Sequence, residues 1–503
     1  MPRLPENWFT AWRDLPYIDL AYEVLSLYIS PSEIPPQDLR ELITRSYSTF
    51  RHSSITPTRP LHYKEVNGDH DAPRTYLLEL FHGPTFAFKD VALQFVGNLF
   101  EYFLLRKNAG VATASERHHL TVLGATSGDT GSAAIYALRG KQDVSVFILH
   151  PKGRVTPIQE AQMTTVLDKN VHNISVVGTF DDCQAIVKSL FSDSEFNKTH
   201  NLAAVNSINW ARILAQIPYY FYSYFSICPR SLTAPDNTAF DPEYIVPTGN
   251  FGDILAGYFA KRMGLPISRL DVATNANDIL DRFMRSGIYE KHSTLDSHAP
   301  GGLTDGGAQA DPSGVKVTLS PAMDVLVSSN FERLLWYLAF EAESDGTHIG
   351  AGATVNSWMK QFKNTGRLQV GQPILGACQR DFYSRAVSDA ETVQTIKAQY
   401  VENGYILDPH TAVGWTTMKH IIQASDWPKQ RCWVSLSTAH PAKFSDAVDL
   451  ALGDIEGYSF DGKVRPAEFV GLEQREKRCR VIDTVDVELV KKAIEEDLVA
   501  ERV

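Results

Sequence analysis

The stretch EYIVPTGNFGDILAGYFAKRMGLP, residues 243–266, predicts a strand, a glycine-containing loop and a helix in direct succession. The stretch HLTVLGATSGDTGSAAIYALRG, residues 119–140, repeats this plan. Short β-rich runs, such as RLDVAT at residues 269–274, lie between further helical patterns. Such an alternation favours an α/β protein with largely parallel sheets, in which ligands bind beyond the carboxyl ends of strands. Both glycine loops are therefore candidate ligand sites.

The loop TGNFGD, residues 248–253, has features of a phosphate-binding turn. Its glycines allow a close approach of the backbone, and the free N–H groups and dipole of the following helix favour an anion. The loop lacks the Lys-Ser/Thr ending of a Walker A motif and the G-x-G-x-x-G spacing of a dinucleotide fold. It fits a phosphate without a nucleotide motif; the alternative is a plain glycine-rich turn.

The loop GATSGDTGS, residues 124–132, carries several hydroxyl groups and one carboxylate. Hydroxyl and backbone N–H groups can bind a carboxylate or a phosphate. Asp129 would repel an anion beside it, so we expect it to face a protonated or hydrogen-bond-donating group. Because Ser, Thr and Asp are preferred helix caps, an N-cap cluster is the alternative.

Lys89 lies in LFHGPTFAFKDVALQF, residues 80–95, among small and aromatic side chains. Burial in apolar surroundings disfavours the charged form of an amine and makes it nucleophilic near neutral pH. Such an amine can form a Schiff base with a carbonyl cofactor; pyridoxal phosphate also needs a phosphate cradle and a partner for its ring nitrogen. The alternative is a solvated lysine at the start of a helix.

The composition excludes several classes of protein. The 503 residues are 44% hydrophobic and 21% charged, with a net charge of −11, which argues against a general nucleic-acid or acidic-membrane binder. No apolar run reaches the ~18 residues that span a bilayer, and the first residues show no apolar h-region behind a basic n-region, so we expect no secretory signal. The five cysteines include no C-x-x-C pair, so we expect no disulfide framework and no metal site. A cytoplasmic location follows as the expectation.

Patterns outside the glycine loops predict the remaining organisation. DLAYEVLSLYI and DLRELITRSYSTF, residues 19–29 and 38–50, predict two helices near the N-terminus. Residues 485–503 predict a charged terminal helix. Residues 292–314 are rich in Gly, Pro, Ser, Thr and Asp and predict a mobile surface loop.

The chain resembles the threonine synthases, in their fungal and enterobacterial-like branch, from about Tyr17 to the C-terminus. The motifs that carry the resemblance are, in order, HGPTFAFKD, GATSGDTGSAA, NSINWARILAQ, PTGNFGDILAG, ATNAND, DPHTAVG and STAHPAKF. This family has the tryptophan-synthase-β-like fold, fold type II of the pyridoxal-phosphate enzymes. The resemblance implies two parallel-sheet α/β domains and a helical N-terminal segment. The expected division is a helical segment at 1–73, a large cofactor-binding domain at 74–95 and 203–503, and a smaller mobile domain at 96–202.

The resemblance implies pyridoxal 5′-phosphate as the cofactor and Lys89 as the lysine that holds it and later moves protons on the substrate. Thr438 matches the hydroxyl partner of the pyridine nitrogen, and Asp129 lies in the loop that flanks the cofactor ring. A neutral hydroxyl leaves that nitrogen less protonated than a carboxylate would. The residues that match the cofactor phosphate loop are Gly249, Asn250, Phe251, Gly252 and Asp253.

The resemblance also implies substrate-binding residues. Those that match the loop for the amino-acid carboxylate are Thr126, Ser127, Gly128 and Thr130. The candidates for the substrate phosphate are Lys152, Arg154, Asn209, Arg212 and Asn275; a surface ion pair is the alternative for an arginine in this group. Three motif histidines are expected to shape the pocket at most: His82, His410 and His440.

The implied reaction converts O-phospho-L-homoserine and water to L-threonine and phosphate, by γ-elimination and β-addition of water, as the last step of threonine biosynthesis. We expect a lyase with a small-molecule substrate, as a monomer or homodimer. The chain starts without the Gly-Gly-Leu-Phe-Ile-Pro-like stretch found upstream in the family, which predicts a shortened or variant N-terminus with less packing.

Three alternatives compete with this interpretation. A related phospho-lyase would share the cofactor machinery and yield 2-oxobutanoate. A non-enzymatic relic that binds the cofactor is opposed by the intact Lys89, TGNFGD and Thr438. A nucleotide-binding α/β protein is opposed by the missing Walker and dinucleotide patterns.

Overall fold

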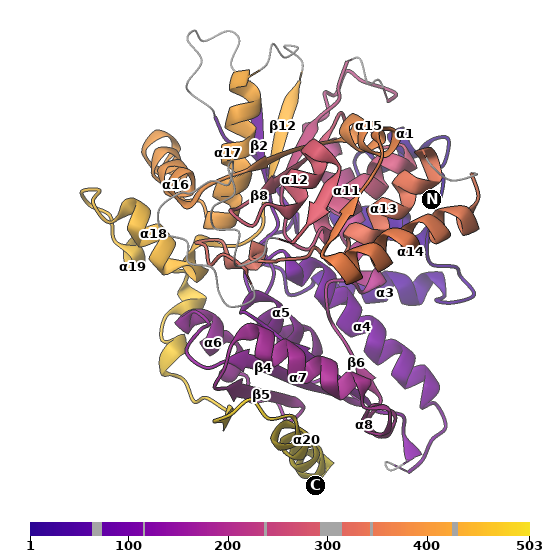
Figure 1. Cartoon of the computed structure of the whole chain (residues 1–503), viewed down its shortest axis with the longest axis vertical. Helices are drawn as coiled ribbons and strands as arrows, with labels where there is room; N and C mark the ends of the chain where they lie inside the picture. The colour runs from indigo at the N-terminus through magenta and orange to yellow at the C-terminus, as the bar shows by residue number, and fades with distance from the viewer. Residues whose placement is uncertain are drawn as a thin grey trace. The chain divides into compact units, whose positions relative to one another are not determined.

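The structure is a computed structural model that describes residues 1–62, 73–113, 116–235, 239–291, 314–342, 346–424 and 431–502 (Figure 1). The predicted surface loop at residues 292–314 lies, except for Gly314, outside the described residues. The chain divides into two compact units. The first consists of Met1–Tyr28, Thr56–Leu80 and Gln216–Lys463, and the second of Ile29–Ile55, Phe81–Ala215 and Val464–Val503. The domain division expected from the sequence stays a prediction.

The first unit contains a sheet in which all neighbouring strands are parallel except the antiparallel edge pair β1–β2. Its order is β1 (Thr58–Pro60), β2 (Arg74–Glu79), β12 (Cys432–Ser437), β7 (Glu243–Pro247), β8 (Leu270–Thr274) and β11 (Phe382–Ala386). A separate antiparallel pair joins β9 (Ile288–Glu290) and β10 (Arg367–Gln369). Since β12, β7 and β8 are adjacent and parallel, their carboxyl ends meet at one edge of the sheet.

Helices of the first unit pack on this sheet and on one another. Helix α17 lies against β12, β7 and β8, and α10 lies against α2 and α11. The helices are α1 (Trp8–Trp12), α2 (Tyr17–Ser26), α10 (Ile217–Ile227), α11 (Gly252–Met263), α12 (Ile279–Ser286), η2 (Pro321–Met323), α13 (Phe331–Ala342), α14 (His348–Thr365), α15 (Gln372–Asp381), α16 (Asp389–Asn403), α17 (Pro409–Ala424), η3 (Pro441–Lys443), α18 (Ser445–Leu452) and α19 (Phe460–Lys463).

The second unit contains a parallel sheet of order β13 (Arg480–Ile482), β5 (Val171–Val176), β4 (Val144–Pro151), β3 (Leu120–Ala125) and β6 (Leu202–Ala203). Its helices are α3 (Pro36–Tyr47), α4 (Lys89–Lys107), α5 (Asp129–Leu138), α6 (Pro157–Thr164), α7 (Phe180–Ser192), α8 (Ser194–His200), α9 (Trp210–Leu214), η4 (Ala467–Phe469), η5 (Leu472–Gln474) and α20 (Val487–Arg502).

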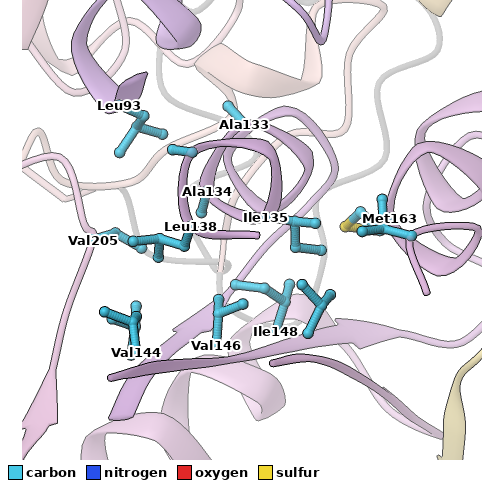
Figure 2. Close-up of a cluster of buried hydrophobic side chains, with 14 of the residues drawn as sticks. Leu93, Ala133, Ala134, Ile135, Leu138, Val144, Val146, Ile148, Met163 and Val205 are labelled. Carbon is cyan, nitrogen blue, oxygen red and sulfur yellow. The ribbon is translucent and has the colours of Figure 1, made fainter. Parts of the chain in front are cut away.

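Strand β4 shows why the second unit has a core on both faces of its sheet. All its residues are buried, and successive side chains of a strand point to opposite faces. Val146 and Ile148 pack with α5 (Figure 2), whereas Phe147 and Leu149 pack with α7 and α20. A strand buried on both faces reads as a continuous apolar run, as parallel sheets require.

The elements predicted from the sequence are present. The run EYIVP forms β7, and the runs at residues 119–123 and 269–274 fall on β3 and β8. The predicted N-terminal helices correspond to α2 and α3, and the terminal helix to α20. The α/β class with largely parallel sheets is confirmed.

Candidate active site

Lys89 is the first residue of α4, and buried contacts of its neighbour Asp90 fix the turn before it. The Asp90 carboxylate accepts hydrogen bonds from the N–H and the hydroxyl of Thr85, both at 2.7 Å. Gly83 lies so close that a Cβ there would overlap the Asp90 side chain. Phe86 adopts a φ of +60°, which is uncommon outside glycine. The turn that presents Lys89 is therefore strongly determined.

Lys89 is nearly enclosed, and 11% of its side-chain surface is exposed. Its Nζ lies 3.7 Å from Oδ2 of Asp129 and 4.8 Å from the centroid of the Phe88 ring. The other carboxylate oxygen of Asp129 accepts a hydrogen bond from Nε2 of Gln159 at 2.8 Å. Asp129 thus faces an amine in this structure, and Gln159 fixes its orientation.

The loop between β3 and α5 uses its threonine to shape its own backbone. Oγ1 of Thr126 accepts the N–H groups of Gly128 and Gly131, at 3.0 and 2.8 Å. Gly128 has a φ of +143°, and a Cβ there would overlap the Gln159 side chain. Thr126 is buried, whereas Ser127 is exposed and Thr130 half-buried. Ser127 and Thr130 therefore remain accessible to a ligand.

The TGNFGD loop connects β7 to α11 in the first unit. Its carbonyls are occupied: that of Gly249 accepts from the Ser328 hydroxyl at 2.8 Å, and that of Asn250 accepts from Nδ2 of Asn330 at 2.9 Å. Phe251 adopts a φ of +62° and buries its ring against two other phenylalanines. The loop is therefore a backbone turn whose carbonyl groups are held by the side chains of Ser328 and Asn330.

This loop fits a phosphate group. Among the described residues, the N–H groups of Asn250, Phe251 and Gly252 have no hydrogen-bond acceptor in the protein. A Cβ on Gly249 would lie 3.0 Å from the Cα of Met323, so a larger residue would disturb the turn. Unpaired N–H groups at a helix N-terminus, where the helix dipole is positive, suit an anion.

The carboxylate of Asp253, in the first turn of α11, binds two tyrosines. Its Oδ1 accepts hydrogen bonds from the hydroxyls of Tyr219 and Tyr220, the latter at 3.0 Å. Burial raises the pKa of Asp253 to about 6, and the two tyrosine hydrogen bonds only partly counter this. The side chain therefore ties the start of α11 to α10.

Thr438 and Asn275 lie at the same sheet edge as the TGNFGD loop. Thr438 directly follows β12, and Asn275 directly follows β8, on either side of β7. Both are buried. Topology thus gathers three of the predicted sites at the carboxyl ends of adjacent strands.

The candidates for the substrate phosphate differ in availability. Nδ2 of Asn275 already donates to a polar cluster, including Oγ1 of Thr318 at 2.8 Å and Oδ1 of Asp324 at 2.7 Å. Asn209 caps α9 by accepting the Ala211 N–H at 3.0 Å. These amides support local structure.

Among the basic candidates, Arg212 is buried, and burial lowers its pKa to about 10. Its Nη1 donates to the carbonyl of Val205 at 3.0 Å. Lys152 and Arg154, in contrast, are exposed just beyond the carboxyl end of β4. Their side chains are the more accessible of the candidates.

Several supporting residues were missed by the sequence interpretation. Gln159 orients Asp129, and Asp408 binds His410, whose Nδ1 lies 2.9 Å from the Asp408 carboxylate. The other two motif histidines, which the sequence did indicate, have local contacts: His440 caps η3, and His82 contacts the ring of His52. The Asp-Pro pair at the start of α17, Asp408 and Pro409, is a helix-start signal that could have pointed to Asp408.

Comparisons with known proteins place the chain in a family. The family model described as "Pyridoxal-phosphate dependent enzyme" matches residues 52–318. "Threonine synthase N terminus" matches residues 1–47, and "Threonine synthase, C-terminal" matches residues 411–494. The threonine synthase of Saccharomyces cerevisiae is 54% identical over 97% of this chain and 90% of its own length. The chain belongs to the threonine synthase family.

Solved structures of family members agree with this assignment. The crystal structure of threonine synthase from yeast has a TM-score of 0.88 and 52% identity, covering 99% of this chain and 92% of its own. The pyridoxal-phosphate-bound threonine synthase from Brucella melitensis has a TM-score of 0.80 and 37% identity, with the same coverage. The predicted fold type II architecture is confirmed.

Membership of this family confirms the function predicted from the sequence. The chain is a pyridoxal-phosphate-dependent lyase with threonine synthase function and a small-molecule substrate. The phospho-lyase alternative is not favoured. None of the described helices combines the length and the apolar character of a membrane-spanning helix, and the described residues include no group of three or more His, Cys, Asp or Glu side chains that could hold a metal ion. The roles of individual site residues stay predictions.

Proposed function

We propose that the chain converts O-phospho-L-homoserine and water to L-threonine and phosphate with Lys89 as its catalytic residue. The observation that carries the proposal is the enclosed Lys89 amine, 3.7 Å from Asp129, in a chain that is 54% identical to a threonine synthase. The reaction needs a group that moves protons at two substrate carbons. An amine held in one place by its surroundings can do both.

In this proposal Lys89 holds the cofactor at rest and is released when substrate binds. When bound, pyridoxal phosphate supplies an electron sink for charge that develops on the substrate carbons. The freed Nζ of Lys89 takes the proton from Cα and then one from Cβ as phosphate leaves Cγ; water adds its oxygen at Cβ, and protons return to Cγ and to Cα. Asp129, oriented by Gln159, faces this amine and stabilises its protonated form.

The remaining roles concern binding. N–H groups of the TGNFGD loop would hold the cofactor phosphate, and the Thr438 hydroxyl would meet the pyridine nitrogen. Ser127 and Thr130 would bind the substrate carboxylate. Lys152 and Arg154 are exposed cations beyond β4, which supports a role in holding the substrate phosphate and the phosphate that leaves.

The variant Lys89→Ala tests this assignment. We expect it to lose the visible absorbance of bound cofactor and the threonine-forming activity while remaining folded. The control is Lys141→Ala, which removes another largely buried lysine of the same unit, paired with Glu101 at 3.0 Å. Loss of absorbance and activity in the control, or their survival in Lys89→Ala, contradicts the role of Lys89.

The product distinguishes the proposal from the phospho-lyase. Wild-type protein given O-phospho-L-homoserine should release phosphate and threonine in equal amounts. Phosphate accompanied by 2-oxobutanoate in place of threonine would refute the synthase assignment.

A further inference from the structure

Asp408 is the centre of a buried polar network in the first unit. It directly precedes α17, and Asp408, His410 and Thr411 are 1%, 3% and 0% exposed. Its carboxylate accepts the backbone N–H groups of His410 and Thr411, at 2.9 and 3.3 Å, as a helix N-cap does. Each carboxylate oxygen also accepts a hydrogen bond from a side chain, which a cap does not require.

The first arm of the network runs from Oδ2 of Asp408 to Thr438. The Thr411 hydroxyl donates to Oδ2. Because its proton is used there, Oγ1 of Thr411 can only accept, and it accepts the N–H of Thr438 at 3.3 Å. The same oxygen lies 3.1 Å from the hydroxyl of Ser437. This arm fixes the backbone of the predicted partner of the pyridine nitrogen.

The second arm runs from Oδ1 of Asp408 to the TGNFGD loop. Nδ1 of His410 lies 2.9 Å from Oδ1 and donates to it, so Nε2 of the neutral ring is left as an acceptor. Nε2 accepts the N–H of Ala322 at 3.1 Å. The carbonyl oxygen of Ala322 and the Cα of Met323 lie 3.1 and 3.0 Å from the place of a Cβ on Gly249. His410 therefore fixes the segment that supports the phosphate loop.

We propose that Asp408 is a positioning residue that sets both ends of the cofactor pocket, the ring-nitrogen end through Thr411 and the phosphate end through His410. The proposal rests on the proposed function, because it takes Thr438 and TGNFGD as the two ends of that pocket. Because one carboxylate holds both chains of hydrogen bonds, it keeps the two ends of the pocket in a fixed position relative to each other. Neither chain can move without breaking a buried hydrogen bond.

The test measures the affinities of wild-type and variant proteins for two ligands, after the cofactor has been removed from each protein. Pyridoxal 5′-phosphate probes both ends, whereas pyridoxal lacks the phosphate. His410→Phe breaks the phosphate arm and should weaken pyridoxal phosphate about fivefold to tenfold while leaving pyridoxal nearly unchanged. Thr411→Val breaks the ring arm and should weaken both ligands by about the same factor. Affinities are measured by equilibrium dialysis.

Matched variants separate the network from general destabilisation. Thr416→Val removes another buried hydroxyl of α17, which lies 2.7 Å from Oγ1 of Thr395, and should leave both affinities unchanged. His410→Gln restores an acceptor for the Ala322 N–H and should recover affinity for pyridoxal phosphate. If His410→Phe does not fold, Asp408→Asn takes its place in the test. The asparagine retains an N-cap but cannot accept hydrogen bonds from both arms, so it should show the affinity losses expected of both arms.

Two results would overturn this inference and leave the proposed function intact. One is an equal loss of affinity for both ligands in His410→Phe, and the other is the same loss of affinity in Thr416→Val as in Thr411→Val. A wild-type protein that binds neither ligand would overturn the proposed function and this inference with it. The ratio of the two affinities within one variant is the decisive quantity, because a loss of folded protein lowers both affinities together.

Discussion

The substitution Asp253→Asn tests how the start of α11 carries a buried charge beside a predicted anion site. Asp253 is 7% exposed, and the groups that face it are the hydroxyls of Tyr219 and Tyr220, with Tyr17 and Tyr244 next to these. None of these groups is a cation. Burial therefore dominates and raises the pKa of Asp253 from 3.8 to about 6, against the lowering effect of the two hydrogen bonds.

The magnitude and sign of the pH effect follow from the difference between the pKa of Asp253 in the folded protein and its ordinary value. Between about pH 4 and pH 6 the folded protein keeps a proton that the unfolded chain has lost, so the free energy of unfolding falls as the pH rises. The contribution of the protonated group is complete below about pH 4 and is lost as the pH passes about 6. At about 1.4 kcal/mol for each pH unit, the loss is about 3 kcal/mol.

The assay is denaturant unfolding of cofactor-free wild-type protein and Asp253→Asn across this pH range. The asparagine keeps the shape and an acceptor for the tyrosines but does not titrate. Its Nδ2 replaces Oδ2, a buried oxygen with no hydrogen-bond partner among the described residues, so it carries a cost of about 1–3 kcal/mol that does not depend on pH. Relative to wild type, the variant should gain about 3 kcal/mol between about pH 4 and pH 7.

A second variant assigns the effect to this site. Tyr219→Phe removes a hydrogen bond that favours the carboxylate, so the pKa of Asp253 in the folded protein should rise further and the loss should continue to higher pH than in wild type. Parallel pH profiles for wild type and Asp253→Asn would refute the reasoning. So would a profile of Tyr219→Phe that coincides with that of wild type.

Two further predictions concern stability. Gly97→Ala places a Cβ against the carbonyl oxygen of Ala137, so it should separate α4 from α5. Thermal unfolding should show a destabilisation of at least about 1–3 kcal/mol. Gly352→Ala, with open space around its Cβ, should instead raise the free energy of unfolding by up to about 1 kcal/mol. Burial, and then the nearby Glu243 carboxylate, raise the pKa of Asp271 well above its ordinary value. Wild-type stability should therefore fall as the pH rises through that pKa, and Asp271→Asn should lack this fall; equal pH dependence would contradict it.

The parts of the fold that the sequence predicted are those that depend on neighbouring residues. The strand, loop and helix at residues 243–263 follow from an apolar run, glycines and a helical pattern that lie next to one another. The order of strands could not be derived in this way, because β12 enters the sheet between β2 and β7 from a distant part of the chain. Pairing over such separations depends on packing, which a local pattern does not record.

The same distinction holds within the site. The apolar neighbours of Lys89 are adjacent to it in sequence, but they left a solvated lysine as an alternative; the family resemblance selected Lys89, and the structure encloses it. The partners that define its surroundings come from elsewhere: Asp129 begins another helix, and Gln159 comes from a third. Asp253 shows the converse, since its motif position predicted a ligand contact while Tyr219 and Tyr220 occupy its side chain.

The motifs therefore contain two kinds of residue, and the structure separates them by what their side chains bind. The hydroxyl of Thr126 binds the loop's own N–H groups, and the ring of His410 binds Asp408 and Ala322. Buried polar side chains of this kind are consumed in fixing a backbone, which is left to offer N–H groups to an anion. Motif side chains such as those of Thr126 and His410 therefore support the backbone, whereas the proposed roles in binding and catalysis fall on the TGNFGD backbone and on the enclosed amine of Lys89.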